Sequence, residues 1–279
     1  MTPDEYCQQK AAASGSSFYY SFLFLPAERR RAITALYAFC REVDDVVDES
    51  SEPHLAATRL AWWRAEVASM FAGKPNHPVT RALGALKDQF SISEQRLNEI
   101  IDGMEMDLTQ TRYLDWPSLE RYCYRVAGVV GKLAAGIFGY RDARTLEYAK
   151  QLGIAFQLTN IIRDVGEDAR KNRIYVPMED LQRFGVTATE ILSARQSPAF
   201  HDLMAFEAAR AKARYRQALE ALPRSDRRAQ RPGLIMAAIY RALLGEIERD
   251  GFQVLAQRTS LTPIRKFWIA WRTWITARG

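Results

Sequence analysis

The stretch Gly153–Tyr175 reads GIAFQLTNIIRDVGEDARKNRIY and contains no proline, so it can form one nearly continuous helix. With an advance of about 100° per residue, four polar side chains fall on one narrow stripe. They are Gln157, Asn160, Asp164 and Asp168. Much of the remaining circumference is apolar, which is typical of a buried helix. The sequence therefore predicts an interior helix that carries amide and carboxylate groups along one side.

The two carboxylates on this stripe need a partner if the helix is buried, because a buried charge must find a cation, a proton or a metal. Asp164 and Asp168 lie four residues apart and present their oxygens from one side, which suits Mg²⁺. Arg163 and Arg173 add positive charge for an anion. The alternative is a pair of solvated aspartates in surface salt bridges, the commoner situation for an isolated acidic pair. The apolar surroundings and the aligned amides favour the interior site.

A second acidic cluster, CREVDDVVDE at residues 40–49, lies in a helix expected to begin near Pro26. The side chains within roughly 40° of one another on this helix are Tyr37, Arg41, Asp44 and Asp48. Asp45 lies slightly to one side. An acidic surface helix would place its aspartates opposite the apolar face, whereas here they share it. The cluster is thus a second indication of a polar site inside a helical core.

The 279-residue chain is 48% hydrophobic and 26% charged, an ordinary globular composition. No linker, repeat or hairpin signal stands out, so we expect one all-α domain over residues 1–279, with helices around a central cavity. A net charge of +6 permits nucleic acid, anionic lipid or phosphorylated substrates. The basic residues are dispersed and no DNA-binding motif appears, so we expect no nucleic-acid partner. The three cysteines without CxxC spacing, the lack of a signal core and the lack of a long apolar run favour the cytoplasm.

The segment SGSSFYYSFLFLP at residues 14–26 interrupts the helical pattern with a serine-rich loop. Hydroxyls and free backbone N–H groups, including those of Ser16 and Ser17, are suited to holding an anion. A helix cap followed by a loop explains the same residues equally well.

Small residues are frequent in YCYRVAGVVGKLAAGIFG at 122–139, and they indicate close approach by another helix or a ligand. Tyr122 lies on the same side of this helix as apolar residues, so it can point inward. On the preceding helix, expected at 93–111, most charges are interpreted as solvated, with Asp107 as a further candidate for the cavity.

The C-terminal segment 261–279 contains PIRKFWIAWRTWITARG. Phe267, Trp268, Trp271, Trp274 and Ile275 form one helical face, and the basic residues lie elsewhere. This pattern is typical of a helix that lies on a membrane surface. Docking of the aromatic face on the protein core is the alternative, and the sequence does not choose between them.

Two acidic clusters on inward helix faces, each near arginines, describe a diphosphate site, and the apolar helices around it suit a hydrocarbon tail. The chain resembles the squalene/phytoene synthase family of head-to-head prenyl synthases. The carrying motifs are YAFCREVDDVVD (Tyr37–Asp48), YCYRVAGVVG (Tyr122–Gly131) and LGIAFQLTNIIRDVGEDARKNRIYVP (Leu152–Pro177). The resemblance runs from about residue 11 to about residue 258 and implies an isoprenoid-synthase-type helical bundle.

The resemblance implies a metal site and a substrate site. It implies Mg²⁺, for which Mn²⁺ can substitute, at Asp44, Asp45, Asp48, Asn160, Asp164 and Asp168, and the same aspartates other than Asp45 are expected to be catalytic. It places diphosphate or cavity contacts at Tyr37, Arg41, Gln157, Arg163, Arg173 and Tyr240. Tyr122 matches the family tyrosine thought to assist proton removal.

Within the family, the stretch CQQKAAASGSSFYYSFLFLP (Cys7–Pro26) is similar to the presqualene diphosphate synthases of bacterial hopanoid biosynthesis, although Ser14–Gly15 replaces the His-Ser pair of many members. We therefore expect condensation of two farnesyl diphosphates to presqualene diphosphate, without NADPH. Alternatives are phytoene synthase, acting on geranylgeranyl diphosphate, and full squalene synthase using NADPH. A non-catalytic assembly factor is disfavoured because both acidic clusters are complete. Downstream enzymes and the inner face of the cell membrane are the expected surroundings.

Overall fold

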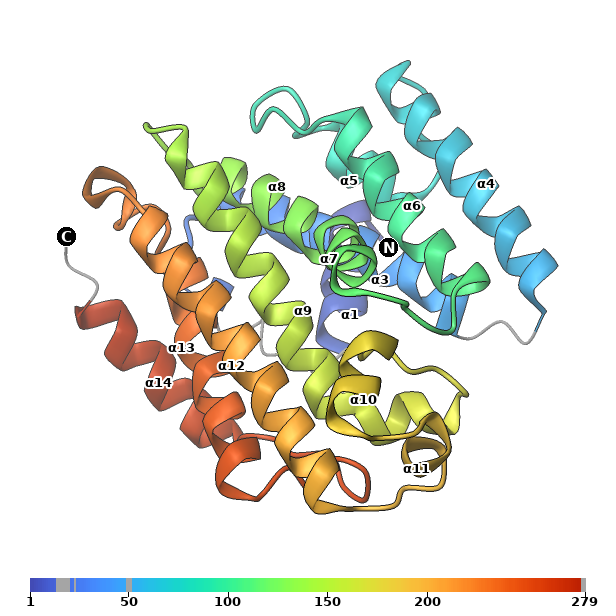
Figure 1. Cartoon of the computed structure of the whole chain (residues 1–279). Helices are drawn as coiled ribbons and strands as arrows, with labels where there is room; N and C mark the ends of the chain where they lie inside the picture. Colours follow the sequence, from blue (N-terminus) through green and yellow to red (C-terminus); the bar gives the residue numbers. More distant parts are fainter. Residues whose placement is uncertain (14–20, 23, 49–51, 277–279) are drawn as a thin grey trace.

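The central helix of the computed structural model is α9 (Arg144–Arg170), which crosses the middle of the molecule in Figure 1. The structure describes residues 1–13, 21–22, 24–48 and 52–276. α9 contacts α8, α12, α13 and the segment before α8, so protein surrounds it on several sides. This position confirms the buried helix expected from its apolar circumference.

The described part of the chain forms a bundle of packed helices without a named strand. In chain order the other helices are α1 (Pro3–Ala13), α3 (Ala27–Asp48), α4 (Pro53–Phe71), α5 (Pro78–Gly84), α6 (Glu94–Thr109), α7 (Trp116–Cys123), α8 (Val129–Phe138), α10 (Met178–Phe184), α11 (Ala188–Leu192), α12 (Pro198–Ala221), α13 (Arg231–Arg249) and α14 (Pro263–Thr276). The all-α expectation is confirmed. None of the helices in the described ranges combines the length and the low polarity that crossing a bilayer requires.

Two groups of buried apolar side chains make up the core. One group lies among α1, α3, α4, α5, α6 and α8, and the other among α7, α9, α12 and α13. The two groups meet along α8 and α9, where small side chains replace large ones. The cavity described below lies at this boundary.

A π-helical turn, Tyr124–Gly128, connects α7 to α8, where we expected one uninterrupted helix. The turn brings the backbone carbonyl of Ala127 against Gly153 of α9, so that a Cβ on Gly153 would lie 2.3 Å from this oxygen. Gly131 on α8 is equally close to the carbonyl of Ala149. The glycines therefore allow close packing of α8 on α9, and π turns of this kind are frequent at functional sites.

The C-terminal helix α14 packs along α13 at the edge of the bundle (Figure 1). Its inner side buries Ala270 completely and stacks Trp274 on Phe24, with 4.9 Å between ring centroids. Trp274 thus belongs to the packed side and lies about 60° around the helix from Trp271. The expected aromatic face is therefore divided in its environment: Trp274 at its edge packs on the protein, whereas Trp268 and Trp271 are half exposed.

Candidate active site

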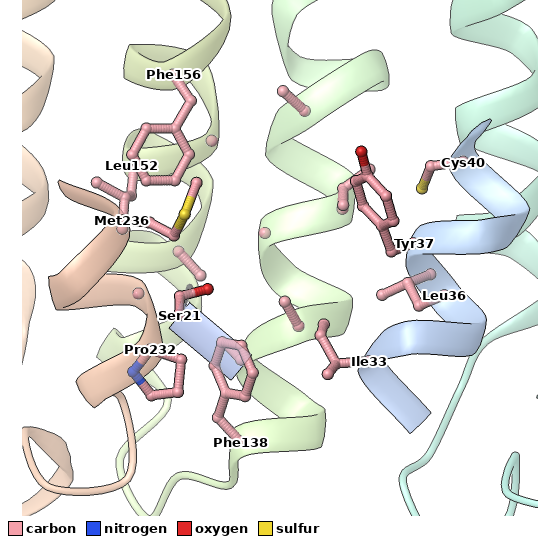
Figure 2. Close-up of a pocket in the computed structure, with 18 of the residues that line it drawn as sticks. Ser21, Ile33, Leu36, Tyr37, Cys40, Phe138, Leu152, Phe156, Pro232 and Met236 are labelled. Atoms are coloured by element: carbon pink, nitrogen blue, oxygen red, sulfur yellow. The ribbon is translucent and has the colours of Figure 1, made fainter. Parts of the chain in front are cut away.

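An apolar cavity runs between α3, α8, α9 and α13 (Figure 2). About 970 Å³ of space lies between its lining atoms, open mouth included. Figure 2 shows Tyr37 and Phe156 toward one end and Phe138, Pro232 and Ile33 toward the other. The lining is mainly aliphatic and aromatic, so this space suits a hydrocarbon chain.

Polar side chains gather at the end of the cavity that is nearer the acidic clusters. Gln157, Asn160, Tyr37 and Tyr240 line the cavity itself. Arg163 lies beside Tyr240, and this guanidinium opposes the rise in the pKa of the Tyr240 hydroxyl that burial causes. The structure therefore brings together the cavity contacts that the resemblance implied on α3, α9 and α13.

The first acidic cluster comes from the last turns of α3. Asp44 accepts a hydrogen bond from Arg41 Nη1 at 2.5 Å, and burial is the main cause that raises the pKa of its carboxyl to about 6. Asp48 lies 3.3 Å from Arg173 Nη1, and thereby connects α3 to the loop after α9. Asp45 instead pairs with Arg41 and with Lys10 of α1, at 2.9 Å from the lysine. This difference follows from its position to one side of the stripe.

The second cluster lies on α9. Asp164 is held by Arg163 and by Arg258, whose Nε is 2.8 Å from Oδ1, and these pairs keep the pKa of Asp164 low despite its burial. Asp168 forms neither an ion pair nor a side-chain hydrogen bond within the described part of the chain. Burial, followed by the charges of Asp164 and Asp107, raises the pKa of Asp168 to about 7.

The oxygen atoms expected to bind metal do not lie close enough together to share one ion. Among the described residues, no group of three or more His, Cys, Asp or Glu side chains is close enough to hold an ion. Instead, Asp44, Asp48 and Asp164 are turned toward neighbouring Arg side chains. The donor set nevertheless fits a hard cation, because the buried Asn160 Oδ1 accepts no hydrogen bond and the Asp168 carboxylate is unpaired.

Tyr122 is 4% exposed and donates a hydrogen bond to Asp107 Oδ2 at 2.8 Å. Tyr175 donates to the other oxygen of the same carboxylate, also at 2.8 Å. The rings of Tyr122 and Tyr175 stack, with centroids 5.2 Å apart. The inward orientation expected for Tyr122 is therefore confirmed, and Asp107 is a buried residue rather than part of a solvated face.

Three side chains at the site were not predicted from the sequence. Lys171, Tyr175 and Arg258 contact residues of the acidic clusters or Asp107. Lys171 and Tyr175 lie in the motif Leu152–Pro177, close to Asp168 in the sequence, so this proximity could have indicated that they belong to the site. Arg258 follows α13 in an irregular segment and has no local pattern. Ser16 and Ser17, expected to contact diphosphate, lie outside the described residues.

Comparison with known proteins bears on this geometry. A family model described as squalene/phytoene synthase matches residues 11–265. The phytoene synthase of Arthrospira platensis is 35% identical over 275 residues, which cover 94% of this chain and 89% of the relative. Three longer chloroplastic phytoene synthases of plants also match, and the chain spans 62, 65 and 63% of their length.

Among solved structures, a dehydrosqualene synthase in complex with a ligand superposes with a TM-score of 0.87 at 30% identity, covering 97% of this chain and 95% of that one. The squalene synthase HpnC from Alicyclobacillus acidocaldarius gives a TM-score of 0.80 at 28% identity, covering 90% and 94%. The sequence relatives are named phytoene synthase. The expected placement among presqualene diphosphate synthases is therefore not confirmed.

Proposed function

Because the chain belongs to the squalene/phytoene synthase family, we propose that it joins two molecules of a prenyl diphosphate head to head, with loss of diphosphate and a proton. The observation that carries the proposal is that α3 and α9, the helices that carry the two acidic clusters, both line one apolar cavity, through Tyr37 on α3 and through Gln157 and Asn160 on α9. The charged end suits diphosphate groups and the apolar length suits prenyl tails. The enzyme class is a prenyltransferase.

The basic residues of the site suit diphosphate binding, and the acidic residues suit metal binding. Arg41, Arg163 and Arg173 would exchange their present carboxylate partners for diphosphate oxygens. Asp44, Asp48, Asp164, Asp168 and Asn160 Oδ1 would hold Mg²⁺, which supplies neutralisation of the leaving diphosphate when it is bound. The apolar wall excludes water from the allylic cation, which would otherwise be captured as an alcohol. Asp45 is a weaker candidate, since Lys10 and Arg41 already hold it.

Two prenyl diphosphates are candidate substrates. The names of the sequence relatives favour geranylgeranyl diphosphate and a phytoene-type product. The N-terminal stretch Cys7–Pro26 favours farnesyl diphosphate and presqualene diphosphate. Both reactions share the cyclopropane-forming step, so the same residues serve either one.

Product analysis tests the proposal. The purified chain is incubated with farnesyl or geranylgeranyl diphosphate and Mg²⁺, with and without NADPH, and dephosphorylated products are identified by mass spectrometry. We expect a condensed C30 or C40 product that requires the metal and disappears with EDTA. Squalene formed only with NADPH would indicate a full squalene synthase. No condensation with either substrate would contradict the proposed activity and favour a non-catalytic role.

We further propose that α14 places the enzyme on an anionic lipid surface, such as the inner face of a cell membrane. Its outer stripe leaves Ile264 83%, Trp268 52% and Trp271 50% exposed. Arg272 flanks this stripe and provides charge complementarity to anionic headgroups, worth about 1 kcal/mol, whereas Arg265 is paired with Glu246. Tryptophan also favours the membrane interface.

Vesicle co-sedimentation tests the lipid proposal. The Trp268→Ser/Trp271→Ser variant should lose salt-sensitive binding to phosphatidylglycerol vesicles while keeping turnover in detergent. Trp62→Ser is the matched control, because Trp62 is 47% exposed on α4, away from α14. Equal binding by the wild-type chain and the double variant would contradict the proposal, as would binding to neutral vesicles alone.

A further inference from the structure

Asp107 lies near the end of α6 and is 8% exposed. It belongs to neither of the two acidic clusters. Both of its oxygens accept tyrosine hydroxyls, from Tyr122 of α7 and from Tyr175 of the segment after α9. Since a tyrosine hydroxyl donates its only proton in each bond, the carboxyl group is ionised in this arrangement. A buried anion is thus held between two neutral phenols.

This carboxylate is electrostatically coupled to both acidic clusters. Its charge contributes to the raised pKa of Asp44 on α3 and to that of Asp168 on α9. Arg173 lowers the pKa of Asp107 through its positive charge, whereas burial is the larger effect and raises it to about 6. Asp107 therefore lies within electrostatic reach of both acidic clusters, charged but able to accept a proton.

Tyr122 is poorly suited to act as a base by itself. Burial, followed by the charge of Asp107, raises the pKa of the Tyr122 hydroxyl well above its ordinary value. A pre-formed tyrosinate beside this carboxylate would place two negative charges together in a buried site. The neutral phenol can accept a proton only if it passes its own proton to a neighbour, and its hydrogen-bond acceptor is Asp107.

The position of Tyr122 is compatible with such a transfer. It lies one helical turn before Val126, which lines the cavity, and the π turn that follows carries Ala127 to the cavity wall. Tyr122 is not among the lining residues, so its phenol lies one turn beyond the lined part of the cavity and is bonded to Asp107. The buried Tyr113 ring packs against both tyrosines, with its centroid 5.4 Å from that of Tyr122 and 5.8 Å from that of Tyr175.

We propose, on the basis of the function above, that Asp107 is a positioning residue that receives the proton of Tyr122 as the cyclopropane closes. The cationic condensation intermediate loses a C–H proton to Tyr122 Oη, and that C–H electron pair forms the new C–C bond. At the same time, the Tyr122 hydroxyl proton moves to Asp107 Oδ2. The carboxylate becomes a carboxylic acid, the cation becomes a neutral ring, and Tyr122 is unchanged. Tyr175 holds the second oxygen in place throughout.

Asp107→Asn tests the assignment because the amide keeps the shape of the side chain but is a far weaker proton acceptor. A general base contributes about 100-fold or more, so we expect kcat for condensed product to fall by at least that factor with little change in KM. The cation should then be captured by water. The ratio of released diphosphate, together with prenyl alcohol, to condensed product should rise above the wild-type value.

The ratio of released diphosphate and prenyl alcohol to condensed product distinguishes proton transfer to Asp107 from a structural role of this residue. If Asp107 only pins α6 to α7, then Asp107→Asn should lower diphosphate release and condensation in proportion, and this outcome would overturn the proposal. Asp107→Glu retains a carboxylate and should restore part of the coupling even if Asp107→Asn folds poorly. A Glu variant that folds but leaves the ratio as high as in a Tyr122→Phe variant would also overturn it.

Two controls complete the design. Asp102→Asn changes a carboxylate on the same helix that pairs with Arg64 at the surface, and it should match the wild type. Tyr175→Phe removes the hydrogen bond that holds the second Asp107 oxygen and should raise the ratio only slightly, whereas a ratio as high as that of Asp107→Asn would indicate a structural network and overturn the assignment. Absence of product from the wild type and Asp102→Asn alike would overturn the proposed function itself, and the assignment with it.

Discussion

Asp168→Asn should stabilise the metal-free protein while abolishing its activity. The Asp168 carboxylate is largely buried beside Asp164 and Asp107, and its pKa is raised from 3.8 to about 7. A difference of this size corresponds to about 4 kcal/mol of unfavourable free energy for the charged form, taken as an upper bound. Asparagine still buries a polar group, so we expect a net gain of about 1–2 kcal/mol. The melting temperature should rise by roughly 2–6 °C.

The pH dependence of this gain has a definite sign. A carboxyl pKa that is higher in the folded than in the unfolded state means that the native protein binds the proton more tightly. The destabilisation by Asp168 is therefore absent below pH 3.8, grows as the pH rises, and is complete above about 7. The advantage of Asp168→Asn should be full at pH 8 and less than half as large at pH 5.

Thermal unfolding followed by circular dichroism in EDTA measures both effects. Asp88→Asn, at a side chain that is 90% exposed, is the matched control and should change neither value. Adding Mg²⁺ with inorganic pyrophosphate should stabilise the wild type more than the variant, because the site then neutralises the carboxylate. A lower melting temperature for Asp168→Asn in EDTA, or an equal gain at pH 5 and pH 8, would refute the reasoning.

Three further outcomes are expected. Tyr122→Phe should retain substrate binding in a calorimetric titration but slow cyclopropane closure or divert the product, and an unchanged rate and product would show a packing role alone. Gly153→Ala should lower the unfolding free energy by about 1–3 kcal/mol in denaturant titrations, because its Cβ would lie 2.3 Å from the Ala127 carbonyl; a neutral result would mean that the helices can separate freely. Trp274→Ala should cost about 1–3 kcal/mol, below the range for fully buried aromatics because Trp274 is only partly buried, and Trp271→Ala should cost less than 1 kcal/mol; similar losses from both would contradict the assignment of faces.

The sequence by itself determined the helical class and the buried central helix, and it placed the aspartates of each acidic cluster on one side of a helix. These features depend on the spacing of apolar and charged residues within one segment, and helical geometry converts that spacing into a face. Asp164 and Asp168 on α9 could be placed together for this reason, as could Asp44 and Asp48 on α3. The family resemblance followed from the same segments.

The tertiary structure alone decided the contacts between segments. Tyr122 and Tyr175 meet Asp107 from positions 15 and 68 residues away along the chain, and Arg258 reaches Asp164 across 94 residues. Trp274 turned to Phe24 because α14 lies against α13, and the π turn arose where α8 packs closely on α9. Local periodicity specifies which side of a helix is apolar. It does not specify which other helix covers that side, at what register or angle, and this information resides in the packing of the whole chain.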